Sequence, residues 1–328
     1  MTSFDTGRDR GQRAAMAQTG SAARDSREGG GGSIPGAPGQ PAFSLVLRDP
    51  SPVPVLIAVP HAGRAYPAEF GETMRNQAAA ALRLEDRFVD RVAEQVARST
   101  GAALLVAHAP RAMIDLNRAP DDVDWDMVAG ATPEKRVRLA AGRRARSGLG
   151  LVPRRLPGLG ELWKRRIDQA ELAARIEQVH QPYHAALGAG LEMLRDRWGA
   201  ALLIDLHSMP PLGPKRGPEA APDFVVGDRF GASCDGGLSA AAFDHFAAAG
   251  RRAAHNRPYA GGYVLDRHAA PARGLHALQL EICRSAYLDA SLREPGPGVA
   301  AVARVLAGLV RRVAEELVGG RSLPQAAE

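Results

Sequence analysis

The most informative pattern in this chain is an apolar run that ends in a histidine. Residues 202–206 are apolar apart from one acid and precede His207, and residues 53–59 precede His61. Apolar runs of this length next to proline and glycine predict strands buried in a sheet. Open α/β sheets bind their ligands beyond the carboxyl ends of such strands. Because neutral imidazole is the commonest protein ligand of zinc, two histidines in this position favour a metal site.

Apolar periodicity predicts that strands and helices alternate along the rest of the chain. Leu84, Phe88 and Val92 recur at the spacing of a helix that buries one face. Residues 160–198 show the same spacing with an interruption at Pro182, which predicts two helices. Further strands are predicted at residues 43–47, 103–107, 112–116, 224–226 and 276–282, and further helices at residues 238–249 and 299–317. This order predicts a three-layer α/β/α sandwich with a mixed, largely parallel sheet.

Composition divides the chain into one domain and two tails. Residues 1–40 contain four consecutive glycines and few large apolar residues, so we expect a disordered tail. Residues 41–320 are predicted to form a single catalytic α/β domain, and residues 321–328 a flexible C-terminus. Residues 119–157 carry several glycines and prolines without sustained apolar periodicity. We expect this segment to be a mobile insertion over the site.

Charge and composition narrow the function classes. The 328 residues carry a formal net charge of +6, but the excess comes from arginines spread through the chain, so we expect no nucleic-acid partner. The same arginines suit a small anionic substrate. We expect no membrane partner and a cytoplasmic location, because no window has the roughly 20 apolar residues that cross a bilayer and no secretory signal is present. Cys234 and Cys283 lack CxxC spacing and predict neither a disulfide framework nor a thiolate zinc site.

A catalytic zinc takes three protein ligands and a water, so His61 and His207 need a third. Asp86 is the best candidate, because it lies in the first turn of the helix predicted from Leu84, downstream of the strand of His61. Glu85 is its near competitor. The alternative for Asp86 is an acid that interacts with the N-terminal end of the helix dipole. Sequence order does not choose between these interpretations.

His207 also has a simpler interpretation, a buried histidine that bonds to a backbone carbonyl. A second histidine at the end of another strand favours metal binding. Asp205 lies two residues before His207 and therefore points to the same face of the strand. It would either orient a metal-binding histidine through a hydrogen bond or make a purely structural hydrogen bond.

Glu281 is the strongest candidate for a general base. It interrupts an otherwise apolar strand, where an ionised carboxylate is costly without a partner or a shifted pKa. A carboxylate beside a zinc-bound water takes the proton of that water as it attacks a carbonyl. The alternative is a buried ion pair with Arg284 or another arginine.

Arg118, Arg267 and Arg284 follow predicted strands or a glycine-rich loop. Guanidinium groups bind carboxylates through paired hydrogen bonds, so these arginines suit an acidic substrate. Each is equally well explained as a surface arginine. Gly261 and Gly262 would let the backbone approach a ligand closely, although a tight turn explains them as well.

Taken in order, several motifs resemble the N-formylglutamate amidohydrolase family between about residue 53 and residue 317. The order of the motifs carries the resemblance, since each motif alone is weak. They are V-P-H-A-G at residues 59–63, D-R-F-V-D at 86–90, I-D-L-N-R at 114–118, D-L-H-S at 205–208, P-Y-A-G-G-Y at 258–263, R-H at 267–268 and H-A-L-Q-L-E at 276–281.

The resemblance implies a mixed sheet flanked by helices, similar in fold to zinc carboxypeptidases and aspartoacylases. The implied activity is hydrolysis of N-formyl-L-glutamate to formate and L-glutamate, in histidine breakdown. The implied cofactor is one zinc ion per chain, held by His61, Asp86 and His207, with Glu281 as the base.

The resemblance also bears on substrate binding. Asn117 and Arg118 look like the carboxylate-binding pair of the zinc carboxypeptidases, and Arg118 would also take part in catalysis. Arg267 matches an arginine of the family that would hold the second carboxylate. The full set of predicted substrate-binding residues is Asn117, Arg118, Arg267, Arg284, Gly261, Gly262 and Tyr263.

Two departures from the family pattern bear on the acyl group. Ala62 stands where the family often has serine, and residues 266–270 lack its usual threonine before the arginine and glycine after the histidine. Two alternatives therefore stay open. One is a related zinc-dependent N-acyl amino acid deacylase or carboxypeptidase-like amidase, and the other is a non-catalytic protein that binds acidic metabolites. The oligomeric state does not follow from the sequence.

Overall fold

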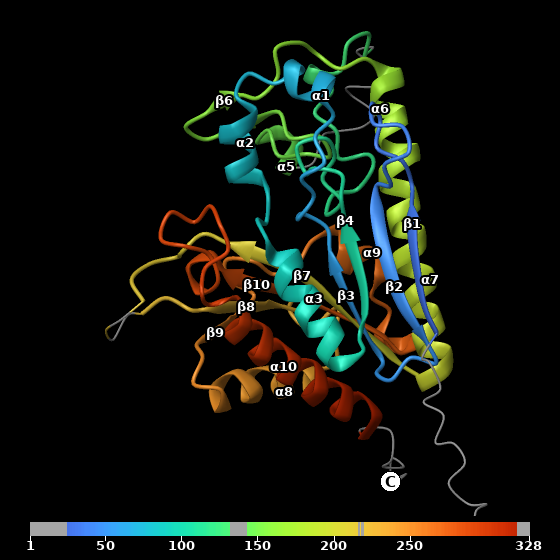
Figure 1. The fold of residues 1–328 in the computed structure, drawn as a ribbon, viewed down its shortest axis with the longest axis vertical. Coiled ribbons are helices and arrows are strands. Elements are labelled where there is room, and N and C mark those ends of the chain that lie inside the picture. The colour runs from blue at the N-terminus through green and yellow to red at the C-terminus, as the bar shows by residue number, and fades with distance from the viewer. Residues whose placement is uncertain (1–24, 132–142, 216, 218–219, 320–328) are drawn as a thin grey trace, which may run out of the picture.

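The computed structural model describes residues 25–131, 143–215, 217 and 220–319. Within these residues an eight-stranded sheet crosses the molecule in the order β1-β2-β4-β3-β7-β10-β8-β9 (Figure 1). Its strands are β1 (Asp25–Gly31), β2 (Phe43–Asp49), β3 (Val55–Val59), β4 (Ala103–Ala107), β7 (Ala201–Met209), β8 (Phe224–Gly227), β9 (Ala253–His255) and β10 (Leu275–Cys283). A separate hairpin pairs β5 (Arg155–Leu156) with β6 (Gly160–Glu161).

The centre of the sheet is parallel. β4, β3, β7 and β10 run in the same direction, and β2 and β8 flank them antiparallel. Every residue of β3 and β7 is buried, as expected for parallel strands that helices cover on both faces. The prediction of a mixed, largely parallel sheet is confirmed. The carboxyl ends of β3, β7 and β10 consequently meet at one edge.

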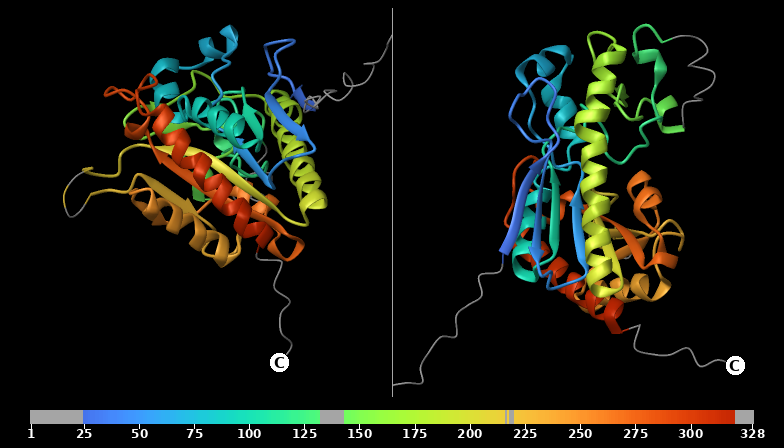
Figure 2. Two further views of the ribbon diagram at one scale, coloured as in Figure 1. Left: turned by 60° about the horizontal axis from the view of Figure 1, so that its bottom comes forward. Right: turned by 90° about the vertical axis from the view of Figure 1, so that its right-hand side faces the viewer.

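Helices cover both faces of the sheet, as Figure 2 shows. Side chains of α3 (Val89–Thr100), α8 (Gly236–Ala248) and α10 (Val299–Gly319) share one hydrophobic core, and those of α7 (Gln181–Trp198) and α9 (Tyr263–His268) share another. Successive residues of a strand alternate between the two cores, since Leu56 belongs to the α7 side and Ile57 to the α3 side. The predicted three-layer α/β/α sandwich is confirmed. No helix in the described ranges combines the length and apolarity that crossing a membrane requires.

Shorter elements gather beyond the carboxyl ends of the central strands, at the top of Figure 1. Arg175 connects several of these segments. It is 1% exposed, donates to Met113 O at 3.0 Å and places its guanidinium over the rings of Phe70 and Trp163. These elements are α1 (Ala68–Thr73), α2 (Gln77–Leu84), the 3-10 helix η1 (Trp125–Met127), α5 (Arg143–Arg146) and α6 (Gln169–Arg175). The π-helix η2 (Ile176–His180) precedes α7, and the 3-10 helices η3 (Pro271–Arg273) and η4 (Arg284–Ala286) flank β10.

The segment before β2 corrects a prediction, because residues 25–40 are not a disordered tail. β1 pairs along its length with β2, and Gly31 lies opposite Phe43. The glycines that suggested disorder make room for this pairing, since a Cβ on Gly31 would lie 2.3 Å from the Phe43 ring. Residues 1–24 of the predicted tail and the predicted C-terminus at 321–328 lie outside the described residues.

The strand predicted at residues 112–116 is also wrong. The chain forms consecutive turns there, in which Met113 N–H donates to Pro110 O at 2.8 Å and Arg118 N–H to Asp115 O at 3.1 Å. The segment is buried, so its apolar residues reflect packing against the core and not pairing in a sheet.

The helix predicted to start at Leu84 begins later. α2 ends at Leu84, and α3 begins at Val89 after Phe88, whose φ of 57° lies in the left-handed region. Asp86 therefore lies in a linker between two helices. An interaction with the dipole of a first helical turn does not explain this residue.

The two helices predicted around Pro182 form one continuous helical segment from α6 through η2 to α7. The π-helix ends with Gln181 N–H donating to Ile176 O, a bond between residues five apart. It widens the helix at the point where Pro182 contributes no N–H.

The predicted insertion at residues 119–157 lies beside the site. Val128 and Leu151 are fully buried in the core that includes α7, and Leu149 and Arg144 line the cavity described below. Residues 132–142 of this segment lie outside the described residues.

Candidate functional site

The two predicted histidines lie side by side at the carboxyl edge of the sheet. His61 follows β3, and His207 lies near the end of β7, which pairs in parallel with β3. Their rings are 4.8 Å apart between centroids, and both side chains are buried. Neighbouring parallel strands thus bring together two imidazoles that are 146 positions apart in the chain.

Asp86 completes the group. Its backbone N–H donates to His61 O at 2.9 Å, which ties the linker between α2 and α3 to the loop after β3. Asp86 Oδ2 lies 3.0 Å from His207 Nδ1 and 3.5 Å from His61 Nδ1. Glu85, the competing acid, instead accepts from Arg87 Nη1 at 3.0 Å. Of the two adjacent carboxylates, Asp86 is the one that faces the histidines.

These three side chains fit a divalent cation. Their ligand atoms lie within 4.8 Å of one another, and all three residues are buried. His61 Nδ1 is a buried nitrogen that has no hydrogen-bond partner among the residues that the structure describes, which is a costly arrangement unless a ligand satisfies it. Two imidazole nitrogens and a carboxylate oxygen match the three protein ligands of a catalytic zinc, which leaves a fourth position for water or substrate.

The other ring nitrogen of each histidine bonds to a buried carboxylate. His61 Nε2 lies 2.7 Å from Asp115 Oδ1, and His207 Nε2 lies 2.9 Å from Asp205 Oδ2. When each Nε2–H donates to its carboxylate, Nδ1 keeps the lone pair that a metal needs. Asp205 therefore has the position expected for orienting His207. Asp115 plays the equivalent part for His61 and was not predicted from the sequence.

The electrostatics around His207 also favour a cation. Burial alone would lower the pKa of His207, but Asp205, Asp86 and Glu281 raise it well above its usual value. Burial alone would raise the pKa of Asp115, but Arg111 and His61 lower it well below its usual range. Asp115 therefore stays ionised beside His61, and a bound cation would balance this negative charge.

Glu281 lies beside this group on the next strand. It is opposite His207 in the parallel pairing of β10 with β7, and it is 7% exposed. Gln279 Nε2 donates to Glu281 Oε1 at 3.1 Å. Burial raises the pKa of Glu281 to about 7, with His207 opposing the shift and Asp86 adding to it. A carboxylate with this pKa both accepts and returns a proton near neutral pH.

These residues open into a cavity of about 320 Å³. Its lining includes His61, Asp86, His207 and Glu281, together with arginines from several segments. The lining arginines are Arg83, Arg111, Arg118, Arg144 and Arg284. The remaining lining residues include Asn117, Leu149, Ser208, Tyr259, Gly261, Gly262 and Gln279.

The predicted pair Asn117 and Arg118 lies on this cavity. Asn117 Oδ1 accepts from Val264 N–H at 2.9 Å, which connects the Asn117 turn to the start of α9. Arg118 Nε donates to Leu149 O at 3.0 Å, and its Nη1 donates to Asn117 O at 2.7 Å. Two hydrogen bonds thus orient the Arg118 guanidinium.

The predicted glycine loop also reaches the cavity. Gly261 has a φ of 104°, which favours glycine. A Cβ on Gly262 would lie 2.6 Å from Asn117 Oδ1, so this glycine allows the loop to pack against the Asn117 side chain. Tyr263 does not line the cavity but packs its ring against His180 at 5.7 Å and His184 at 5.2 Å.

The two other predicted arginines differ in position. Arg284 lines the cavity, but it is 9% exposed and donates to Ser208 Oγ and Glu85 O, with Nη2 3.4 Å from Asp86 Oδ1. It therefore holds the linker that carries Asp86. Arg267 is exposed on α9, does not line the cavity and donates to Tyr263 Oη at 3.0 Å.

Sequence reasoning missed three arginines of the cavity. Arg111 donates to Asp115 Oδ2 through Nε at 3.0 Å and lies in the turns that replace the predicted strand. Arg83 lies in the last turn of α2, and Arg144 lies on α5. The available signal was the local excess of arginine in segments without a strand pattern, which does not distinguish these arginines from surface residues.

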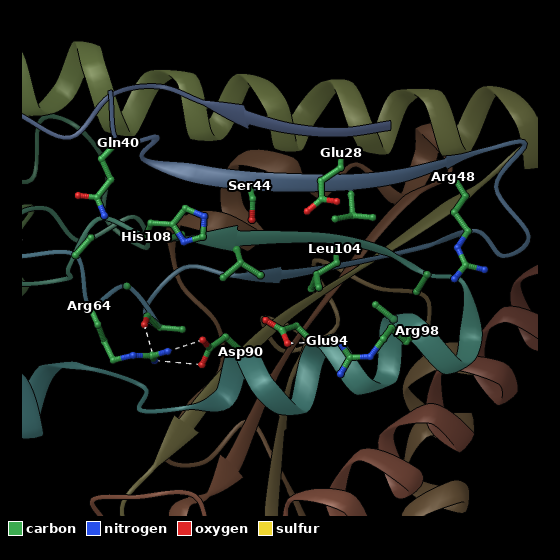
Figure 3. Close-up of a pocket in the computed structure, with 18 residues that line it drawn as sticks. Glu28, Gln40, Ser44, Arg48, Arg64, Asp90, Glu94, Arg98, Leu104 and His108 are labelled. Carbon is green, nitrogen blue, oxygen red and sulfur yellow. Dashed lines mark hydrogen bonds and ion pairs between the residues drawn. The ribbon is translucent and has the colours of Figure 1, made fainter. Parts of the chain in front are cut away.

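A larger cavity of about 600 Å³ lies over β2 and β4 beside α3 (Figure 3). Arg64 and Asp90 bond to each other on one side of it, with Nη1 to Oδ1 at 3.1 Å, and Glu94 pairs with Arg98 at 3.5 Å. Within the described ranges, the group of side chains able to hold a metal lies in the smaller cavity. The smaller cavity is therefore the candidate site.

Three comparisons bear on the identity of this site. A family model described as N-formylglutamate amidohydrolase matches residues 53–288. N-formylglutamate deformylase of Pseudomonas putida is 32% identical over 256 residues, which cover 72% of this chain and 82% of that protein. N-formylglutamate deformylase of Pseudomonas aeruginosa is 31% identical over 273 residues, with 81% and 93% covered.

A solved structure agrees with these relatives. The crystal structure of N-formylglutamate amidohydrolase from Ralstonia eutropha matches with a TM-score of 0.75 at 35% identity, and the match covers 85% of this chain and 99% of that one. The family match spans β3 to η4, the part of the chain that supplies His61, Asp86, His207 and Glu281. On this evidence the chain belongs to the N-formylglutamate amidohydrolase family.

Proposed function

We propose that this protein hydrolyses N-formyl-L-glutamate to formate and L-glutamate in a zinc-dependent reaction. One observation carries the proposal. A buried His-Asp-His group and a buried carboxylate share one cavity with five arginines. The metal-type ligands and the carboxylate suit hydrolysis of an amide, and the arginines suit a substrate with two carboxylates.

His61, Asp86 and His207 would hold the zinc ion. When bound, zinc polarises the formyl carbonyl and lowers the pKa of the attacking water. Asp115 and Asp205 keep the two imidazoles in the tautomer that leaves Nδ1 available.

Glu281 would act as the general base and then as the general acid. In its ionised form it takes a proton from the water whose oxygen forms a bond to the formyl carbon. It returns this proton to the amide nitrogen as the C–N bond breaks, so that glutamate leaves as a neutral amine and formic acid carries the added oxygen and the second proton of the water. Transfer of that second proton to the amine gives formate and the ammonium form of glutamate. A pKa of about 7 suits both steps near neutral pH.

The arginines would bind the two substrate carboxylates. Arg118 is held by hydrogen bonds to Leu149 O and Asn117 O and, with Asn117, would grip one carboxylate. Arg83, Arg111 and Arg144 line the same cavity. Since Arg267 does not line it, we assign the second carboxylate to this group instead.

A substrate panel tests the proposal. Purified protein, with its metal content measured, is assayed on N-formyl-, N-acetyl- and peptidyl-glutamate at equal concentration. We expect release of formate and the highest kcat/KM on N-formyl-L-glutamate, with stoichiometric zinc. A preference for the acetyl or peptidyl substrate would instead identify a related deacylase or amidase. Binding of glutamate with no turnover of any substrate would identify a metabolite-binding protein.

A further inference from the structure

Three histidines form a second cluster, separate from the group of His61, Asp86 and His207. His184 Nδ1 lies 2.9 Å from His268 Nε2, and the rings of His180 and His184 are 4.4 Å apart. His180 and His184 are 2% and 1% exposed. They come from three elements, His180 from η2, His184 from α7 and His268 from α9. Nothing in the proposed chemistry uses these side chains directly.

The cluster bonds to the backbone on both sides of Asn117. His180 Nε2 donates to Arg118 O at 2.9 Å, and His184 Nε2 donates to Leu116 O at 3.0 Å. Carbonyl oxygens only accept, so both Nε2 atoms carry a proton. His184 Nδ1 is then an acceptor, and it accepts from His268 Nε2–H. Each contact therefore has one consistent direction.

The same cluster connects the two segments that would bind substrate. α9 attaches to the Asn117 turn at its start, where Val264 N–H donates to Asn117 Oδ1. It attaches again at its end, where His268 donates to His184, which in turn holds Leu116 O. The π-helix η2 ends at His180, four residues before His184, so both imidazoles project from one side of the helix.

Arg118 shows why this backbone needs support. Among the described residues its Nε and Nη1 donate to Leu149 O and Asn117 O, and Nη2 makes no hydrogen bond to the protein there. Its guanidinium is aimed by main-chain atoms, so a shift of the turn would move the guanidinium with it.

We propose that His180, His184 and His268 are positioning residues that fix the Leu116–Arg118 turn so that Asn117 and Arg118 face the substrate carboxylate. The inference rests on the proposed function of the cavity. It assigns these histidines an effect on substrate binding and none on the metal or on Glu281.

His180 offers the cleanest test. His180→Leu removes the bond to Arg118 O, and His180→Gln keeps a side-chain donor that reaches it. We expect His180→Leu to raise KM for N-formyl-L-glutamate about tenfold, the scale of one lost buried hydrogen bond. We expect kcat and zinc content to change less than about twofold, and His180→Gln to restore most of the wild-type KM.

A double-mutant cycle distinguishes positioning from general loosening. If His180 acts through Arg118, His180→Leu adds little to the KM of Arg118→Met, because the two residues act as one unit. A fold-change in the double variant equal to the product of the single effects would overturn the proposal. So would an unchanged KM in a folded His180→Leu.

His245→Leu is the matched control. His245 Nε2 donates to Val305 O at 2.8 Å, so this variant also loses one imidazole-to-carbonyl bond, but between α8 and α10. Its KM should match the wild type. Failure of the proposed function is separately visible as absent turnover in the wild type. In that case the same cycle is measured on the Kd for L-glutamate. A double variant whose Kd changes by the product of the single effects, or an unchanged Kd in a folded His180→Leu, would then overturn the inference.

Discussion

Glu281 on β10 lies opposite His207 on β7 in the parallel register of the two strands. This pairing brings the proposed base to the proposed metal ligand without any loop between them. Both side chains line one cavity, and burial raises the pKa of Glu281 to about 7. Rigid strands hold catalytic groups more reproducibly than loops do. Glu281 and His207 are therefore assigned different functions, proton transfer and metal binding, and mutagenesis can distinguish the two.

Glu281→Gln should lower kcat for N-formyl-L-glutamate by about 10²–10⁴-fold, the usual contribution of a general base. The amide keeps the size of the side chain, and its oxygen still accepts from Gln279, so the fold should persist. Zinc content should equal that of the wild type, since Glu281 is outside the His-Asp-His group. Steady-state kinetics and metal analysis on the same preparation measure both quantities. Glu315→Gln, at an exposed position of α10, is the control. A kcat of Glu281→Gln within twofold of the kcat of Glu315→Gln would exclude Glu281 from the mechanism.

Asp86→Asn and Glu85→Gln form a matched pair for metal binding. The two acids are adjacent and buried, but only Asp86 faces the histidines. Asp86→Asn should reduce zinc affinity by more than about 100-fold. Loss of a residue that only hydrogen-bonds to a metal ligand already lowers metal affinity by about 10–100-fold. Glu85→Gln should retain stoichiometric zinc. Metal analysis after dialysis measures this, and equal zinc in the two variants would remove Asp86 from the ligand set.

Gly262→Ala tests how closely the glycine loop packs on Asn117. The added Cβ would lie 2.6 Å from Asn117 Oδ1, which also accepts from Val264 N–H. Overpacking of this kind costs about 1–3 kcal/mol, so kcat/KM should fall by about 5–150-fold. Gly236→Ala on α8 is the control, because its Cβ would meet nothing within 4 Å. Equal kcat/KM in the two variants would show that Asn117 moves without functional cost.

The sequence predicted the part of the site that lies on strands. Apolar runs ending at His61, His207 and Glu281 indicate buried strands, and parallel strands meet at their carboxyl edge. The apolar runs therefore predict that these residues lie at the carboxyl edge of the sheet. The same reasoning predicted the three layers and the mixed sheet.

The part of the site on turns could not be read in this way. Asp115 and Arg111 lie in a buried turn. Its apolar residues resemble those of a strand, because a buried turn and a buried strand are both rich in apolar residues. Asp86 lies in a linker that hydrophobic spacing assigned to a helix. Arg267 matched a family motif, yet its side chain turns to Tyr263. Turns are placed by long-range contacts, which local periodicity does not encode.

The buried histidine cluster should make the protein acid-sensitive. Burial lowers the pKa of His184 to about 2, whereas an unfolded histidine has a pKa near about 6.5. Between these values the unfolded chain binds a proton that the folded chain does not, so the free energy of unfolding falls as pH falls. From pH 7 to pH 5 this single group should cost up to about 2 kcal/mol.

Urea unfolding of wild type and His184→Gln at pH 7 and pH 5 measures this contribution. Glutamine keeps a donor for Leu116 O but has no titrating group, so the variant should lose less stability between the two pH values than the wild type. His245→Gln, which removes a histidine outside this cluster that bonds to Val305 O between α8 and α10, should keep the wild-type pH dependence. If His184→Gln and wild type lose the same free energy on acidification, His184 is protonated in the folded state and the neutral hydrogen-bond chain through Leu116 and His268 does not exist.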